Sequence, residues 1–233
     1  YSLHELGVRN IVGLEKAGAI PSDIGSTSHA SDFIFNTGHD KLSNWTTAYS
    51  RNFYDENGFF LKRGGMEICR KGDDERWEEL KRKVASGKAF GTNARLISAR
   101  EATEKFPLLE ESAIRGAMWD PNAGLVVPRS LDFVLEMVSR AEKKGHLQTW
   151  TNTPATGFEI EDGRVRGVHT RHGTIRAPLV VVTAGIWGPA VGELAGVRVP
   201  LWPVEHPLLF FGPLESIQGT REFLVHPLFR DQG

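Results

Sequence analysis

The chain has 233 residues, enough for one large domain or two small ones with a substantial buried core. Its 28 basic and 29 acidic residues nearly balance, and no basic cluster stands out, which argues against a nucleic-acid partner. No apolar run reaches the roughly 20 residues that span a bilayer, so no membrane association is expected. The single cysteine, Cys69, cannot form a disulfide within the chain and favours a reducing compartment.

The first part of the chain carries a nucleotide-binding pattern. Residues 1–7 are typical of the end of a helix that Gly7 closes, and residues 10–15 are a short apolar strand that ends in Glu15. Such an acid is typical of the second strand of a dinucleotide-binding βαβ unit, where it accepts hydrogen bonds from the ribose hydroxyls. The glycine-rich turn that should precede this strand is absent. We therefore expect the chain to be a piece of a longer protein, or one that has lost its first strand.

Amphipathic helices and short strands follow. In residues 73–88, Trp77, Leu80 and Val84 share one helical face, and charged residues cover the rest. Ser98 and Glu101 form a capping box that should begin a short helix. The expected elements are helices over 40–53 and 73–88, a short helix from 98 to about 106, and strands over 59–62 and 66–69 around a turn at 64–65.

The second half predicts one long helix and several strands. The helix begins at Ser130 and ends at Gly145, and Asp162 with Gly163 marks the turn of a hairpin. The expected strands are 155–160 and 164–170 in the hairpin, a buried parallel strand over 179–183 and a short strand over 208–211. No linker rich in Pro, Gly or Ser divides the chain, so two interleaved lobes are expected rather than two consecutive domains.

Five motifs occur in order: GSTSHA at 25–30, FPLL at 106–109, DPNAGL at 120–125, TAGIWG at 183–188 and PVEH at 203–206. With these motifs the chain resembles the flavin-containing part of the dimethylglycine and sarcosine oxidases and dehydrogenases, within the D-amino-acid-oxidase-like superfamily. The resemblance covers nearly all of the chain.

The resemblance implies an α/β fold in which a Rossmann-like FAD-binding domain is interleaved with an antiparallel-sheet substrate lobe and lacks its first βα turn. The FAD-binding domain is expected over 1–65 and 125–197. The substrate-binding lobe is expected over 66–124 and 198–233, and is incomplete. Asp32 stands where family members tend to carry smaller or apolar residues, which would alter the electrostatics near the flavin or shift the loop.

The resemblance also implies FAD as the cofactor, with possible covalent attachment through His29, and a small amine as the substrate. His206 matches a histidine on the substrate side of the flavin, which places or deprotonates the amine. No metal site is expected, because the other histidines have no supporting ligands around them. The cofactor-binding residues that the resemblance implies are Glu15, Lys16, Ser26, Thr27, Ser28, His29, Phe33, Ala155, Gly185 and Trp187.

The predicted function is FAD-dependent oxidation of a secondary or tertiary amine of the N-methylglycine type, by hydride transfer to the flavin. Two alternatives stay open. In the first alternative, the chain is another amine or amino-acid oxidase of the same superfamily. In the second, it is a non-catalytic fragment or subunit whose FAD domain needs a partner chain or a missing segment. The expected compartment is the cytoplasm, or the mitochondrial matrix in a eukaryote.

Overall fold

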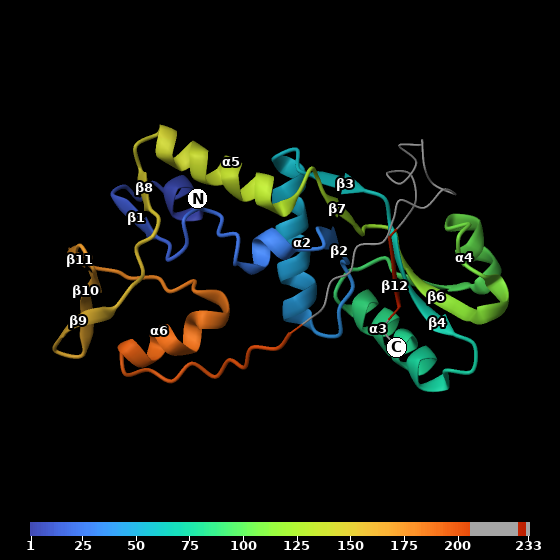
Figure 1. Ribbon diagram of the computed structural model, residues 1–233. Helices are drawn as coiled ribbons and strands as arrows, with labels where there is room; N and C mark the ends of the chain where they lie inside the picture. Colours follow the sequence, from blue (N-terminus) through green and yellow to red (C-terminus); the bar gives the residue numbers. More distant parts are fainter. Residues whose placement is uncertain (206–227, 232–233) are drawn as a thin grey trace. The chain divides into compact units, whose positions relative to one another are not determined.

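The computed structural model describes residues 1–205 and 228–231, and the chain forms two compact units (Figure 1). Unit 1 comprises Tyr1–Ala30 and Ser130–Leu209, and unit 2 comprises Ser31–Arg129 and Phe210–Gly233. Each unit is therefore built from separate stretches of sequence. The strand expected over 208–211 lies outside the described residues.

Unit 1 contains a parallel strand pair and an antiparallel meander. Its elements in chain order are α1 (Ser2–Glu5), β1 (Ile11–Leu14), the 3-10 turn η1 (Ser26–His29), α5 (Ser130–Lys143), β8 (Leu147–Trp150), β9 (Gly157–Glu161), β10 (Arg164–Thr170), β11 (Gly173–Arg176), the 3-10 turn η3 (Gly185–Trp187) and α6 (Gly188–Leu194).

Strands β1 and β8 pair in parallel, with Ile11 opposite Leu147 and Leu14 opposite Trp150. Helix α5 contacts β8 and η1, and its buried side chains are Phe133, Met137 and Ala141. These residues recur every four positions and so form one apolar face. Gly145 ends this segment with a φ of +69°, the left-handed conformation that the sequence predicts for a helix cap.

Strands β9, β10 and β11 form a three-stranded antiparallel sheet with β10 in the middle. Asp162 and Gly163 both have positive φ, as a tight hairpin turn requires, so the predicted hairpin is confirmed.

The buried strand expected over 179–183 does not form, and this prediction is wrong. These residues belong to no strand, and Leu179, Val181 and Val182 are 70%, 59% and 49% exposed. An apolar run becomes a strand only where a neighbouring backbone completes its hydrogen bonds. In the described part of unit 1, the parallel sheet holds β1 and β8 alone, so no pairing strand lies beside this run.

Unit 2 contains two sheets and three helices in its described residues. Its elements in chain order are β2 (Phe33–Ile34), α2 (Lys41–Glu56), β3 (Phe60–Lys62), β4 (Gly65–Arg70), α3 (Asp74–Ala89), β5 (Arg95–Ser98), α4 (Ala99–Lys105), the 3-10 turn η2 (Glu111–Ala113), β6 (Ile114–Asp120), β7 (Gly124–Val126) and β12 (Leu228–Asp231).

The larger sheet of unit 2 has the strand order β12-β4-β6-β5, with β4 and β6 antiparallel and β12 parallel to β4. Successive residues of β4 enter different apolar clusters, because side chains alternate between the two faces of a strand. Met66 and Ile68 pack with residues of β5, α4 and β6, whereas Cys69 packs with Leu80 and Val84 of α3. The core of unit 2 therefore lies on both faces of this sheet.

The smaller sheet has the order β2-β7-β3, with Phe33 and Leu61 both opposite Leu125. This pairing joins residues 31–62 to residues 124–129 inside unit 2. The boundaries of the units therefore differ from the predicted domain boundaries after residues 65 and 124.

The predicted helices of unit 2 are confirmed, and so is the predicted N-terminal cap at Ser98; the cap at Asp40 was not predicted. The side chains of Asp40 and Ser98 accept hydrogen bonds from the backbone N–H groups of Ser43 and Glu101. The hydrogen bonds from Ser43 hold the pKa of Asp40 below its ordinary value. In the ranges that the structure describes, no helix has the length and apolar character needed to cross a membrane.

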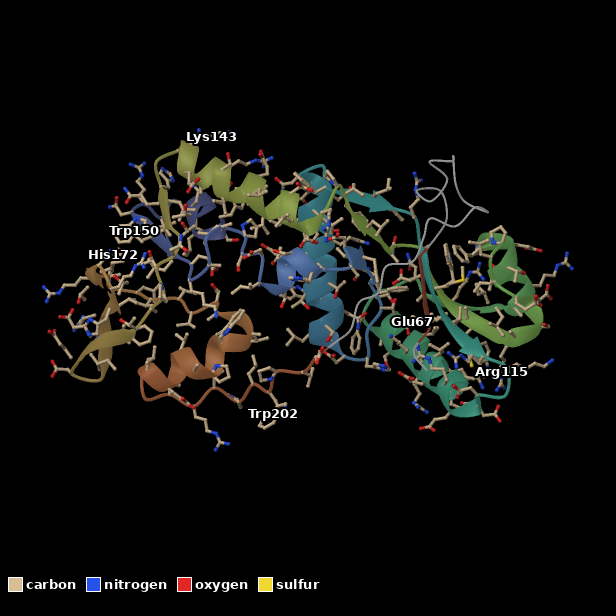
Figure 2. All side chains as sticks on the ribbon, in the orientation of Figure 1. Glu67, Arg115, Lys143, Trp150, His172 and Trp202 are labelled. Carbon is tan, nitrogen blue, oxygen red and sulfur yellow. The ribbon has the colours of Figure 1, made fainter. Side chains whose placement is uncertain are left out.

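Helix α3 departs from its predicted pattern, because not all of its charged residues face solvent. Arg76 and Lys83 are buried beside Glu67 of β4, which is itself completely buried. Glu67 is labelled in Figure 2. Glu67 Oε2 accepts a hydrogen bond from Arg76 at 2.9 Å, and Oε1 accepts one from Lys83 at 2.6 Å. We call Glu67, Arg76 and Lys83 the buried ionic triad. A buried acid is tolerated here because both of its oxygens are paired with cations.

Candidate functional site

The acid at the end of β1 is held from two sides. The Glu15 N–H donates to the carbonyl of Trp150 at 2.9 Å, and the Glu15 carbonyl accepts from the N–H of Thr153 at 2.8 Å. Its carboxylate oxygen Oε1 accepts a hydrogen bond from the N–H of Ala17 at 2.8 Å. Its other oxygen has no hydrogen-bond partner among the described residues. Glu15 is half-buried, and its second carboxylate oxygen is available to accept hydrogen bonds. An adenosine ribose requires such an acceptor for its hydroxyl groups at this strand end.

Two further residues predicted to bind the cofactor lie against each other. The Lys16 ammonium is 3.6 Å from the centroid of the Trp187 ring, a cation–π contact. Trp187 ends η3, which begins at Gly185 with a φ of +53°. A side chain there would be strained by the backbone conformation, and no other atom of the described residues lies within 4 Å of the position its Cβ would take. The structure thus brings the residue after Glu15 to the end of the TAGIWG motif.

The histidine of the GSTSHA motif is exposed at the end of η1. Its Nδ1 lies 3.1 Å from the carbonyl oxygen of Gly25. Because a carbonyl can only accept, Nδ1 carries the proton, and in the neutral ring Nε2 of His29 keeps its lone pair. The neighbouring Ser28 hydroxyl donates to the carbonyl of Ser22 and closes the loop. The arrangement presents a nucleophilic ring nitrogen to the outside.

The other predicted residues lie in different places. Ser26 is exposed and Thr27 half-buried within η1, and Ala155 is half-buried in the segment before β9. Phe33 belongs to unit 2, where its ring makes an edge-to-face contact with Phe35 at 5.8 Å. His206 lies outside the described residues. The predicted residues in unit 1 are Glu15, Lys16, Ser26, Thr27, Ser28, His29, Ala155, Gly185 and Trp187.

Sequence reasoning missed the segment that supports Glu15. The N–H of Asn152 donates to the carbonyl of Ala17 at 2.8 Å, and Thr153 is buried. Asn152 has a φ of +50°, which asparagine tolerates better than most residues. The Asn-Thr-Pro sequence at 152–154 is a turn signal, and it could have identified this segment.

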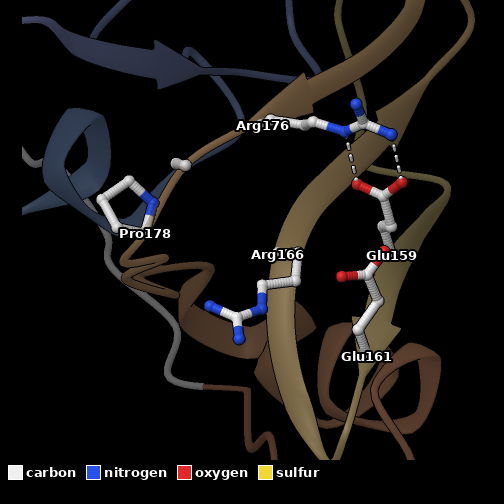
Figure 3. A pocket seen from close by; sticks show the side chains of 6 residues that line it. Glu159, Glu161, Arg166, Arg176 and Pro178 are labelled. Carbon is white, nitrogen blue, oxygen red and sulfur yellow. Dashed lines mark hydrogen bonds and ion pairs between the residues drawn. The ribbon is translucent and has the colours of Figure 1, made fainter.

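Unit 1 also has two hollows that contain none of the predicted cofactor residues. One, of about 470 Å³, lies on the β9–β11 sheet and is lined by Glu159, Glu161, Arg166, Arg176, Ala177 and Pro178 (Figure 3). Arg176 binds Glu159 there with two hydrogen bonds of 3.0 and 2.8 Å, which lower the pKa of the carboxyl. The other, of about 640 Å³, lies between α6 and residues 196–202. Over residues 1–205 and 228–231, no three His, Cys, Asp or Glu side chains lie close enough to hold a metal ion.

Residues 1–232 match the family described as "DAO: FAD dependent oxidoreductase". The chain therefore belongs to this family of FAD-dependent oxidoreductases, and the predicted resemblance is confirmed.

Two relatives have the names of dehydrogenases of methylated glycines. The chain is 30% identical over 239 residues to the mitochondrial sarcosine dehydrogenase of Homo sapiens, covering 97% of this chain and 25% of that protein. It is 27% identical over 238 residues to the mitochondrial dimethylglycine dehydrogenase of Rattus norvegicus, covering 99% of this chain and 27% of that protein. The chain thus spans about a quarter of the length of these relatives.

A solved structure supports the fold. The L-proline dehydrogenase of P. horikoshii superposes with a TM-score of 0.76 at 21% identity, covering 96% of this chain and 64% of the other. At this identity the likeness concerns the fold alone. It confirms the predicted mixed α/β class.

Proposed function

We propose that the chain is the flavin-binding part of an FAD-dependent oxidoreductase that oxidises a secondary or tertiary amine of the N-methylglycine type. One observation carries the proposal: Glu15 follows a parallel strand and has a carboxylate oxygen that no residue in the described ranges binds, next to the Lys16–Trp187 contact. FAD supplies the acceptor for the hydride that leaves the carbon beside nitrogen.

In this proposal unit 1 is the FAD-binding domain and unit 2 the substrate lobe. Glu15 accepts hydrogen bonds from the adenosine ribose, while Ser26, Thr27 and Ser28 and the backbone at Gly185 approach the cofactor. His29 offers Nε2 as the point of covalent attachment, because its Nδ1 is committed to a carbonyl. His206 is proposed to orient or deprotonate the amine.

The substrate class rests on the sarcosine and dimethylglycine dehydrogenases among the relatives. The alternative within the family is another amine or amino acid. Anaerobic mixing with sarcosine, dimethylglycine, glycine and proline in turn separates the two, because a true substrate bleaches the visible flavin band. Bleaching by proline or glycine but not by the N-methylglycines would favour the alternative. The mitochondrial relatives make the mitochondrial matrix the proposed compartment in a eukaryotic source.

The first experiment measures visible absorption of the purified protein before and after acid precipitation, with mass spectrometry of the pellet. Flavin that stays in the pellet on the peptide containing His29 would support the covalent proposal. The variant His29→Ala should release the flavin on precipitation, whereas the control His172→Ala, at an exposed turn residue, should not. Colourless protein of the correct mass would refute the proposal and favour a non-catalytic subunit.

A second experiment tests the ribose contact. In the His29→Ala background, where the flavin is not covalently attached, Glu15→Gln keeps the size of the side chain but removes the charge, and should weaken FAD binding by about 10- to 100-fold, since a hydrogen bond to a charged group contributes about 1.5–3 kcal/mol. Glu161→Gln is the matched control, because Glu161 is an exposed acid at the end of β9 in the same unit. Equal affinities for the two variants would contradict the role of Glu15.

We also propose that unit 1 takes up one further parallel strand beside β1, from another segment of the protein or from a partner chain. In a parallel pair alternate residues bond to one neighbour, so Val12 and Leu14 turn their backbone groups away from β8. The exposed side chains of Leu179, Val181 and Val182 show that unit 1 leaves apolar surface uncovered, as an incomplete sheet would. Hydrogen exchange of the Val12 and Leu14 amides in the protein isolated from its source tests this: slow exchange is expected, and exchange at the rate of a free edge would contradict it.

A further inference from the structure

The chain passes between the two units at two places in the described residues. These crossings lie at Ala30–Ser31 and at Arg129–Ser130, and a third, at 209–210, lies outside the described ranges. An ion pair joins the unit 2 ends of the two crossings. The Nε of Arg129 donates to Oδ2 of Asp32 at 3.1 Å, although the two residues are 97 positions apart in sequence.

The backbone of Asp32 is fixed at the same point. Its carbonyl accepts a hydrogen bond from the N–H of Val126 at 2.6 Å, directly before the β2–β7 pairing of Phe33 with Leu125. Asp32 has a φ of +64°, a left-handed conformation that aspartate adopts more readily than most residues other than glycine. The residue therefore combines a backbone turn, a backbone hydrogen bond and an ion pair.

The Asp32 carboxylate is mostly shielded from solvent. Its side chain is 12% exposed, whereas that of Arg129 is 44% exposed. The half-buried Tyr54 of α2 lies within its electrostatic reach: burial and the Asp32 charge together raise the pKa of Tyr54. A shielded carboxylate interacts with its cation more strongly than a fully exposed one does, because less water screens the charges.

We propose that Asp32 and Arg129 form a clamp that holds the two crossing segments together and so positions the end of the loop that carries His29. Both are positioning residues, and their effect on the flavin rests on the proposed function. Because the clamp ties two distant segments at the point where each leaves unit 2, its loss frees both crossings at once.

Amide hydrogen exchange tests the clamp directly. The variants are Asp32→Asn, which tolerates the left-handed turn but lacks the charge, Arg129→Gln, and the double variant. The amides of residues 30–33 and 126–130 should exchange about two- to fivefold faster in each variant. This factor corresponds to the free energy that a partly exposed ion pair contributes. The double variant should add little to either single one. Glu101→Gln is the control, because it breaks the exposed Arg95–Glu101 pair of the same unit and should leave both segments unchanged.

Visible circular dichroism of the flavin-loaded protein supplies the readout that a purely structural role would not change. Asp32→Asn and Arg129→Gln should alter the visible circular dichroism of the bound flavin in the same way, and Arg129→Lys should restore part of it. Unchanged exchange in both single variants, or strictly additive effects in the double variant, would overturn the clamp. If Asp32→Asn does not fold, the Arg129→Gln and Arg129→Lys variants test the clamp, because Arg129 is the more exposed partner. If the wild-type protein binds no FAD, the proposed function is refuted, while hydrogen exchange still decides the clamp.

Discussion

Removal of the charge of Glu67 should destabilise unit 2 strongly. Glu67 is 0% exposed, and Arg76 and Lys83 are 6% and 5% exposed, with hydrogen-bond distances of 2.9 and 2.6 Å. Although burial opposes the charge on Arg76, the hydrogen bond to Glu79 and the charge of Glu67 raise its pKa, so the group remains a cation. Glu67→Gln would therefore leave Arg76 with Glu79 alone and remove the anion that Lys83 binds. Breaking such a buried pair costs about 3–5 kcal/mol.

Urea unfolding at neutral pH, followed by hydrogen exchange at the amides of β4 and β6, measures this loss. With a slope of about 2–3 kcal/mol per molar urea, the midpoint of unit 2 should fall by roughly 1–2 M. The matched control is Glu101→Gln, which breaks the exposed pair with Arg95 and should cost no more than about 1 kcal/mol.

A second variant separates the loss of the ion pair from a change in packing. The triple variant Glu67→Met, Arg76→Leu and Lys83→Met removes all three charges and keeps similar volumes. It should be close to the wild type in stability, because an apolar replacement of a buried ionic group is often neutral or stabilising. A cost below about 1 kcal/mol for Glu67→Gln, or a triple variant as unstable as the single one, would refute the reasoning.

Two other predictions concern a close packing contact and a histidine pair. Gly64 has a φ of +75° and its added Cβ would collide with the Trp119 ring, so Gly64→Ala should cost about 1–3 kcal/mol more in urea unfolding than Gly58→Ala. Gly58 has the same backbone sign and open space around it, so equal costs would exclude the collision. Burial and the nearby charges, that of His4 first, lower the pKa of His146, whose Nδ1 lies 2.7 Å from that of His4. Because the pKa of His146 is lower in the folded protein than in the unfolded chain, the unfolded chain takes up this proton at a higher pH. The free energy of unfolding should therefore fall as the pH drops below about 7. A His146→Gln variant with the same pH dependence of stability would contradict the assignment.

The sequence predicted the features that depend on near neighbours. The helix over 40–53, the helix capped by Ser98, the Gly145 helix end and the hairpin at Asp162 are all present, because the side chains that specify them lie within a few positions of the backbone they control. The family motifs likewise led to the correct family, since five short segments in fixed order are a property of sequence alone. The placement of Glu15 at a strand end followed from the same local pattern.

The sequence could not determine the features that depend on distant partners. The run 179–183 has the composition of a buried strand, yet strand formation requires a neighbouring backbone that composition does not supply. The charged residues of α3 were predicted to face solvent, but Arg76 and Lys83 are buried because Glu67 of β4 lies beside them.

What the sequence by itself determined, then, is the family, the helices with the cap at Ser98, the hairpin turn and the acid that follows β1, because each depends on residues close together in the chain. The tertiary structure alone decided the boundaries of the two units, the buried ionic triad and the contact of Lys16 with Trp187. The physical reason is that strand pairing, burial of charge and side-chain contacts join residues tens of positions apart, and their free energy depends on which neighbour the fold supplies.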